Sequence, residues 1–287
     1  MRLLSFDTST DKLQLCLFED GKPVVERSGY DGAPTDAGHR QQMVAYLMPM
    51  IEEAMEEAGW PKESLGCIVV GQGPGSFTGI RSGVVTARTL AQALKLPLIA
   101  VCLLETVASE CALPSAVVLA AGKGHYFVAA YDAEPANSSQ PSAIESVQNL
   151  KTMAAPAYVS PQELIANIGS VRRWAVDKAC SLPAELCDGH EVVELPNVKN
   201  IATRQAQIAW NRLSLTMSNE TNGKISAGGA AESLTTEREN RLRERLSEIF
   251  AFEAVQPLYL RSPSVTIKAN TQQNANENQA DAPGRHR

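Results

Sequence analysis

The sequence predicts an α/β protein in which an antiparallel hairpin precedes alternating helices and strands. Apolar residues alternate in the first thirty positions, where Asp20–Gly21 is a hairpin-turn dipeptide. Apolar residues then recur at helical spacing in two segments, each followed by a short, continuously apolar strand. These observations give the element order β-β-β-α-β-α-β over residues 1–6, 12–18, 23–30, 40–58, 66–70, 76–94 and 97–101.

The second half of the chain repeats this order more loosely. We expect strands and helices there over residues 115–120, 125–131, 143–147, 161–168, 174–176, 191–195 and 201–217. A hairpin followed by crossover helices is the order of the ribonuclease-H-like unit, from which actin-like folds are built by duplication. The sequence therefore predicts an actin-like (ASKHA, ribonuclease-H-like) α/β fold with two related subdomains, the second one degraded.

The predicted organisation has three parts. Residues 1–105 form the first subdomain, residues 106–263 a smaller second one, and residues 264–287 an Asn/Gln-rich disordered tail. A segment rich in Ser, Asn, Gly and Ala, residues 218–236, is expected to be a mobile insertion. An Arg/Glu-rich helix over 237–250 follows, and this last helix is free to pack back on the first subdomain.

Composition narrows the classes of function. The net charge is −6 and the sequence pI is about 5.4, with no basic stripe of the kind that proteins use to neutralise phosphates. Any role on RNA is therefore expected to need a partner that supplies the cations. The six cysteines have no zinc-type spacing, no apolar run is long enough to cross a membrane, and no signal peptide is present, so we expect a cytoplasmic location.

Two segments carry residue types that suit phosphate binding. Asp7-Thr8-Ser9-Thr10 follows the first strand, and a carboxylate with hydroxyls in a turn can face a nucleotide and its metal. A glycine-rich segment, residues 71–83, forms a sharp turn into a helix, whose N-terminal N–H groups attract anions. The simpler interpretation is that both segments are ordinary turns. The candidate nucleotide- or phosphate-facing residues are Asp7, Thr8, Ser9, Gly73, Gly75 and Ser76.

Small residues form a stripe on the helix that follows this turn. Gly79, Gly83, Ala87 and Ala91 recur every four residues, so one face of the helix is nearly free of side chains. Glycine inside a helix costs about 0.5–1 kcal/mol relative to alanine, which suggests that close packing offsets the cost. The neighbour is either helix 40–58 of the same chain or a partner subunit, and the sequence leaves both open.

Catalytic motifs are missing from the sequence. The four histidines are too far apart to form a His-x-x-x-His pair, and no nucleophile elbow is present. We therefore assign no catalytic and no metal-ligating residue.

Three stretches resemble the TsaB family: FDTST at residues 6–10, VGQGPGSFTGIR at 70–81 and PLYLR at 257–261. This family is the non-catalytic dimerisation subunit of the bacterial machinery that places threonylcarbamoyl on a tRNA adenosine beside the anticodon. The resemblance implies a heterodimer with the catalytic subunit TsaD, contact with the ATPase TsaE, a homodimer when TsaD is absent, and tRNA contact only through the complex. It also implies that ATP or ADP, if bound, lies at the interface of the complex. Where the family usually shows Asp-Ala-Arg-x-Gly-Glu, the stretch from Ala120 to His125 lacks the acidic residue, and this departure argues against ATP binding by the chain alone.

The resemblance places the partner interface on the two helices of the first subdomain. The expected interface residues are Met43, Leu47, Met50, Ile51, Gly79, Ile80, Gly83, Ala87 and Ala91. On this hypothesis, replacing Gly83 with Leu abolishes dimerisation and leaves the monomer folded. Two alternatives remain: an actin-like ATPase or kinase that acts alone, favoured by Asp7 and the glycine-rich turn, and a metallopeptidase, against which the scattered histidines argue.

Overall fold

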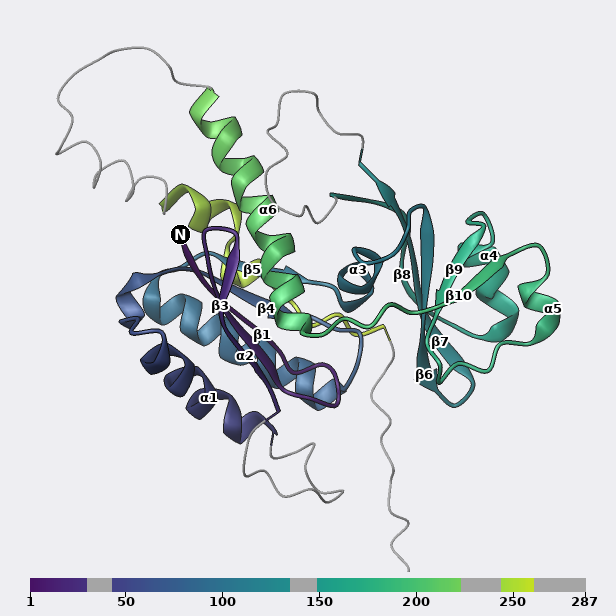
Figure 1. Cartoon of the computed structure of the whole chain (residues 1–287), viewed down its shortest axis with the longest axis horizontal. Coiled ribbons are helices and arrows are strands. Elements are labelled where there is room, and N and C mark those ends of the chain that lie inside the picture. The colour runs from purple at the N-terminus through teal and green to yellow at the C-terminus, as the bar shows by residue number, and fades with distance from the viewer. Residues whose placement is uncertain (30–42, 135–148, 223–243, 261–287) are drawn as a thin grey trace, which may run out of the picture.

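The computed structural model describes residues 1–29, 43–134, 149–222 and 244–260. They form two lobes, each built on a five-stranded mixed sheet (Figure 1). The first lobe contains the sheet of β1 to β5 together with helices α1, α2 and α6. The second lobe contains the sheet of β6 to β10 with the shorter helices. The predicted α/β, actin-like class is confirmed by this architecture and by the structural likeness given below.

The first sheet has the strand order β3-β2-β1-β4-β5. β1 pairs antiparallel with β2 and parallel with β4, so the hairpin and the crossover connections meet at the centre of the sheet. The strand bounds are β1 (Arg2–Asp7), β2 (Gln14–Glu19), β3 (Lys22–Ser28), β4 (Leu65–Gly71) and β5 (Leu98–Val101). The carboxyl ends of β1, β4 and β5 therefore lie at one edge of the sheet, where the turn after Asp7 and the glycine-rich loop meet.

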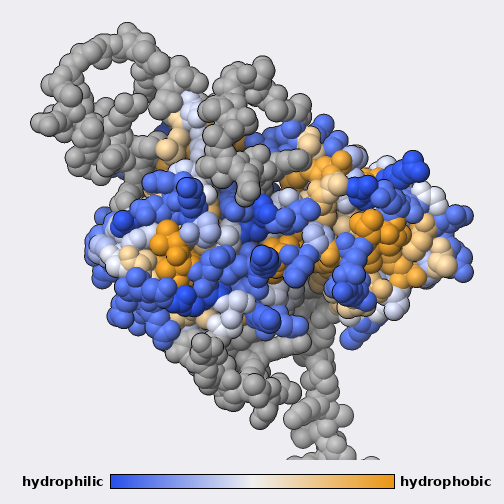
Figure 2. Space-filling model, viewed as in Figure 1, coloured by the Kyte–Doolittle hydropathy of each residue, from blue (hydrophilic) through white to orange (hydrophobic). Residues whose placement is uncertain are grey.

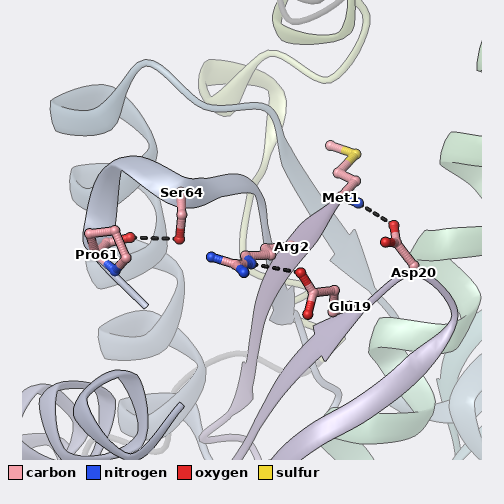
Figure 3. A network of polar contacts seen from close by, with 6 residues as sticks. All are labelled: Met1, Arg2, Glu19, Asp20, Pro61 and Ser64. Carbon is pink, nitrogen blue, oxygen red and sulfur yellow. Dashed lines mark hydrogen bonds and ion pairs between the residues drawn. The ribbon is translucent and has the colours of Figure 1, made fainter. Parts of the chain in front are cut away.

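Polar contacts fix the opposite edge of this sheet, at the start of β1 (Figure 3). The N-terminal ammonium group of Met1 pairs with Asp20, and Arg2 donates to Glu19 across the β1–β2 ladder at 2.7 Å. The Arg2 guanidinium also lies 4.8 Å from the centre of the Trp60 ring. Cation and aromatic ring at this distance attract each other. These contacts hold the hairpin in register at the end away from the candidate site.

Helices cover both faces of the first sheet (Figure 1). α1 (Met43–Glu57) and α2 (Phe77–Leu94) pack on one face, and α6 (Ile201–Asn222), from far along the chain, packs on β1, β2 and β4 at the other face. Every residue of β4 is consequently buried. A sheet covered on both sides explains the continuous apolar runs in its strands.

The second lobe has the strand order β10-β9-β6-β7-β8. Its strands are β6 (Ser115–Gly122), β7 (His125–Ala133), β8 (Leu150–Val159), β9 (Arg173–Val176) and β10 (Glu191–Glu194). α4 packs on one face of this sheet and α3 on the other. The remaining α-helices are short: α3 (Leu103–Ala108), α4 (Leu164–Ile168) and α5 (Ala184–Cys187). The 3-10 helices in the described residues are η2 (Lys62–Ser64), η3 (Pro161–Glu163) and η4 (Phe252–Ala254).

Local signals in the sequence located most elements within a few residues. The helix expected over 76–94 is α2, and Gly59 adopts φ +64° just after α1, as a helix-ending glycine does. The capping box before α4 is present, because the Glu163 carboxylate accepts from the Ser160 N–H at 2.9 Å. α3, α5 and β8 were not predicted, because α3 and α5 are short and β8 mixes exposed and half-buried residues without strict alternation.

Some expectations on domain organisation lie outside the described residues. These are the strand over 143–147, the tail over 264–287 and most of the insertion over 218–236, although α6 continues into that insertion as far as Asn222. Of the helix expected over 237–250, residues 244–249 are described and are helical. The boundary at residue 105 stays a prediction. α6, which lies in the range assigned to the second subdomain, packs on the sheet of the first.

None of the helices in the described ranges is long and apolar enough to cross a membrane.

Candidate functional site

The turn after β1 is buried and centred on the Asp7 carboxylate. One carboxylate oxygen, Oδ1, accepts from the Ser9 N–H and from the Ser9 hydroxyl, each at 2.7 Å. The other, Oδ2, accepts from the Nε2 amide of Gln205 on α6 at 2.7 Å. Asp7, Thr8 and Gln205 have no exposed surface, and Ser9 is also buried. All the carboxylate's recorded donors therefore come from this chain, and none of its surface is open to a ligand.

The glycine-rich loop, residues 71–76, packs directly on this turn. The Ser76 N–H, at the N-cap of α2, donates to the Ser9 carbonyl at 2.7 Å. A Cβ on Gly75 would lie 2.1 Å from that same carbonyl oxygen, and Gly73 adopts φ +91°, a left-handed conformation that favours glycine. The loop thus contacts the chain's own backbone where a phosphate cradle would leave open space.

Gly71, the last residue of β4, passes the Asp7–Gln205 pair at very short range. A Cβ at this position would lie 1.8 Å from Asp7 Oδ2 and 2.9 Å from Gln205 Nε2. Only glycine leaves room for the amide to reach the carboxylate here. The sequence singled out Asp7 and the loop, but it gave no signal for Gln205, which stands 198 residues from Asp7 along the chain.

Thr8 explains the glycines inside α2. Its hydroxyl donates to the Gly79 carbonyl at 2.7 Å. A Cβ on Gly79 would lie 1.9 Å from the Thr8 carbonyl oxygen, and a Cβ on Gly83 would lie 2.2 Å from the Thr8 hydroxyl. The close neighbour of these two glycines is therefore the turn after β1 of the same chain. The sequence had offered helix 40–58 or a partner subunit, and neither is what these two glycines contact.

This packing corrects the predicted partner interface. Of the nine expected residues, eight are buried in this chain: Leu47, Met50, Ile51, Gly79, Ile80, Gly83, Ala87 and Ala91. The side chain of the ninth, Met43, lies outside the described residues. A helix face of small residues indicates close packing against a neighbour. The sequence of the helix does not show whether that neighbour belongs to the same chain or to a partner. The expectation that Gly83→Leu leaves the monomer folded is also wrong in physical terms, because the new side chain would collide with Thr8.

The outer face of the same two helices is exposed. Met48 on α1 and Val85 on α2 have 40% and 55% of their surface accessible, and Glu52 and Arg81 beside them are exposed too. We call these residues the outer helix face. A further apolar area lies over β9 and β10 in the second lobe (Figure 2), where Val192 is 44% exposed. The stripe of small residues on α2 predicted an interface on the face that packs inside the chain. The sequence analysis therefore did not identify the outer helix face.

The hairpin turn between β6 and β7 in the second lobe differs from the turn after β1, because it is exposed. Gly122, Lys123 and Gly124 all have positive φ, which makes a tight turn between β6 and β7. No acidic side chain stands in it, and the adjacent His125 ring stacks on Tyr158 with 4.8 Å between ring centres. The segment from Gly122 to Gly124 is thus a simple exposed turn in the structure.

The cysteines are free and lie in packed surroundings. Burial raises the pKa of Cys16 to about 12 and that of Cys102 to about 11, and it raises the pKa of Cys67 further still. A thiol that stays protonated at neutral pH is a poor nucleophile. Within the described ranges, no group of three or more His, Cys, Asp and Glu side chains is placed to hold a metal ion.

A polar pocket of about 220 Å³ lies between α3, α6 and the start of β8. It contains an ion pair between Arg212 and Glu105, and Arg212 also donates to the Ala100 carbonyl at 3.2 Å. The charge of Arg212 is therefore balanced within the chain. None of the residues predicted to bind a nucleotide or a partner lines this pocket.

Comparison with known proteins identifies the family. The family model described as "TsaD: tRNA N6-adenosine threonylcarbamoyltransferase" matches residues 34–269. The TsaB protein of Escherichia coli (strain K12) is 32% identical over 108 residues, which cover 38% of this chain and 43% of that protein. TsaB of Bacillus subtilis (strain 168) is 33% identical over 110 residues, covering 38% and 44%. The aligned part thus spans less than half the length of these curated relatives.

The solved structure of YeaZ from Pseudomonas aeruginosa is similar in fold. It superposes with a TM-score of 0.50 and 19% identity, over 75% of this chain and 93% of that one. At this identity the likeness establishes the fold alone. Because the family model covers most of the chain, the chain belongs to the family described as TsaD: tRNA N6-adenosine threonylcarbamoyltransferase.

Proposed function

We propose that this chain is a non-catalytic subunit of the complex that forms N6-threonylcarbamoyladenosine on tRNA, and that it supports the catalytic subunit TsaD by binding it through the outer helix face. The observation that carries the proposal is the exposure of Met48 and Val85 on two helices whose inner residues are committed to the chain's own core. Family membership supports the pathway, because the curated TsaB relatives are named for threonylcarbamoyladenosine biosynthesis.

The outer helix face has the composition of a protein-binding surface. Met and Val supply apolar area, and the exposed Glu52 and Arg81 provide a polar surround. Interfaces commonly have an apolar centre within a polar rim, with charges depleted at the centre. Since α1 and α2 rest on a sheet that is buried on both faces, the surface is rigid, and a rigid surface loses little conformational entropy on binding.

Two features support a non-catalytic role. The Asp7 carboxylate, the best candidate ligand for a nucleotide-bound metal, is buried and occupied by Ser9 and Gln205. The matching turn of the second lobe, from Gly122 to Gly124, contains no acid. These contacts weigh against the alternative of an ATPase that acts alone. They agree with ATP or ADP being held at the interface of the complex.

The remaining partners follow from the same proposal. A chain with net charge −6 and no basic stripe is expected to reach tRNA only through the complex. TsaE is proposed to join the assembly of this chain with TsaD. When TsaD is absent, the outer helix face is available to a second copy of this chain, which gives a homodimer.

The interface is tested by placing a charge on it. Val85→Arg is expected to weaken binding of purified TsaD at least tenfold, because about 1.4 kcal/mol corresponds to a factor of ten in affinity and an unpaired buried charge costs more. Isothermal titration calorimetry measures the affinity. Val192→Arg, at a similarly exposed valine on the second lobe, is the matched control and should bind TsaD normally. Normal binding by Val85→Arg would refute the proposed surface.

The non-catalytic role is tested by reconstitution. The chain is incubated with tRNA and threonylcarbamoyl adenylate, alone or together with TsaD, and modified adenosine is measured by mass spectrometry. We expect product only in the presence of TsaD, and a loss of product for Val85→Arg that is relieved at high protein concentration. Product formed by the chain alone would show that it is a catalyst itself. Calorimetry with ATP and magnesium on the isolated chain tests the ATPase alternative, and we expect no binding.

A further inference from the structure

Residues 250–260, here called the C-terminal strap, contact both lobes. The Leu98 N–H of β5, at the edge of the first sheet, donates to the Phe250 carbonyl at 3.0 Å. Further on, the Leu258 N–H donates to the Gln72 carbonyl at 3.0 Å, so the strap is bonded to the glycine-rich loop through its backbone. The proposed partner surface makes no use of this segment, although its PLYLR residues resemble the family.

The side chains of the strap enter two different cores. Val255 is buried in the cluster between the first sheet and the α1–α2 layer, and Phe252 packs against that cluster. Leu258 and Leu260 instead pack against the cluster formed by α3 and the second sheet. The strap therefore crosses from one lobe to the other, and in Figure 1 the last coloured segment runs between the two sheets.

An aromatic stack joins the strap to α2. The Tyr259 ring lies on Phe77, the first residue of α2, with 4.6 Å between ring centres and 27° between ring planes. Tyr259 remains 44% exposed, so this contact can be lost without opening a core. Beyond Val255, residues 256–260 of the strap are exposed or half-buried. Segments held by few buried contacts open locally at much lower cost than the whole domain.

The strap contacts both lobes, so a change in the orientation of the lobes would alter its contacts. Lobes of one chain move relative to each other by default unless a substantial interface holds them. The strap bonds to the glycine-rich loop, whose Gly73 carbonyl in turn accepts from the Leu103 N–H at the start of α3. Strap, loop, α2 and α3 therefore form one hydrogen-bonded and stacked junction between the lobes.

We propose that the C-terminal strap is a latch that couples the orientation of the second lobe to the N-terminal turn of α2, and thereby regulates binding at the outer helix face. This inference rests on the proposed function, because it assigns a regulation to that same surface. In the docked state, Tyr259 and Leu258 hold the first turn of α2 and the loop in place. In the undocked state, the Gln72 carbonyl and the Leu258 N–H are solvated, and the second lobe is free to reorient.

Hydrogen exchange on the isolated full-length chain tests the latch. Tyr259→Ala is expected to speed amide exchange at least tenfold at Leu258 and Leu103, because both amides donate to the glycine-rich loop at the junction. Amides in the centre of β1 and β4 should not change. Tyr259→Phe keeps the ring and should exchange like the original chain. His125→Ala removes the stack on Tyr158 in the second lobe and should leave the two junction amides unchanged.

Two results would overturn the latch. If Tyr259→Ala leaves exchange at Leu258 and Leu103 unchanged, the stack does not hold the strap. If exchange at the junction speeds up but calorimetry shows unchanged affinity for TsaD, the strap opens without regulating the outer helix face. We expect at least fivefold weaker binding for Tyr259→Ala and full recovery for Tyr259→Phe. Failure of the Val85→Arg test would remove the partner surface and leave the exchange result standing, so the two proposals are separable.

Discussion

The hairpin turns β1–β2 and β6–β7 occupy equivalent places in the two lobes and are built in opposite ways. At the first, Thr8 and Ser9 are buried, with hydrogen bonds from Thr8 to α2 and from α6 to Asp7. The turn from Gly122 to Gly124 has no helix over it and is held mainly by its own backbone conformation. A Cβ on Gly124 would meet nothing within 4 Å, whereas one on Gly79 would meet a carbonyl oxygen.

This difference shows that glycine has two separate roles in the chain. At the turn after Asp7, the glycines of α2 leave out a side chain so that another segment can approach. At the turn from Gly122 to Gly124, glycine supplies a positive φ. Only the first role depends on residues far away in the sequence. Substitutions at the two turns should therefore differ most where distant contacts are lost and least where the contact is local.

The largest effect is expected at Asp7. Asp7→Ala leaves the Ser9 N–H, the Ser9 hydroxyl and the Gln205 amide without their acceptor in a buried site. An unsatisfied buried donor costs about 1–3 kcal/mol, so the free energy of unfolding should fall by at least about 3 kcal/mol. Urea denaturation measures it. Asp132→Ala in β7, where the carboxylate accepts only from the neighbouring Ala133 N–H, should change stability by less than about 0.5 kcal/mol. Equal losses in the free energy of unfolding for Asp7→Ala and Asp132→Ala would contradict the proposed difference between the two lobes.

Gly79→Ala should be the next most severe change. The new methyl group would meet the Thr8 carbonyl, a backbone atom that cannot turn aside. Overpacking costs about 1–3 kcal/mol, and a contact of 1.9 Å with a backbone oxygen places this change at the upper end. Alanine recovers about 1 kcal/mol of helix propensity, so a net loss of about 2 kcal/mol is expected. Gly124→Ala is the same substitution in open space and should cost about 1 kcal/mol through its positive φ alone. Thermal unfolding measures the loss of melting temperature for both variants. A larger loss for Gly124→Ala than for Gly79→Ala would contradict the packing argument.

A smaller loss is expected at Gln205. Gln205→Met removes one donor to Asp7, but it also removes the amide oxygen Oε1, which is buried without a recorded hydrogen-bond partner. A hydrogen bond to a charged group contributes about 1.5–3 kcal/mol and an unsatisfied acceptor costs about 1 kcal/mol or more, so the net loss should be about 1 kcal/mol. In a double-mutant cycle with Asp7→Ala, the two losses should not add. Additive losses would mean that the amide and the carboxylate act independently.

The smallest effect is local to the second lobe and depends on pH. Donation from the Ser160 N–H and hydroxyl lowers the pKa of Glu163 below its ordinary value. Because the folded pKa is the lower one, the cap stabilises α4 above the ordinary pKa and is lost as the pH falls through the folded value. An NMR titration of the Ser160 amide between pH 2 and 6 should follow this transition. Glu163→Gln should abolish it.

Local patterns in the sequence were sufficient for most of the architecture. The hairpin, the helix over 76–94 with its N-cap Ser76, and the capping box at Ser160 depend on residues within a few positions of one another. Such features follow from periodicity and capping chemistry alone. The sequence also identified the two segments that meet at the carboxyl ends of β1 and β4, namely residues 7–10 and 71–83.

Only the tertiary structure decided what these segments contact. Spacing shows that Gly79 and Gly83 share one face, but a periodic pattern says nothing about what lies opposite, and the turn at Thr8 fills that place. Likewise, Asp7 at a strand end could face a ligand, until Gln205 from α6 reaches it across 198 positions of sequence. Contacts between distant segments arise from how the layers stack, and for that physical reason no local pattern encodes them.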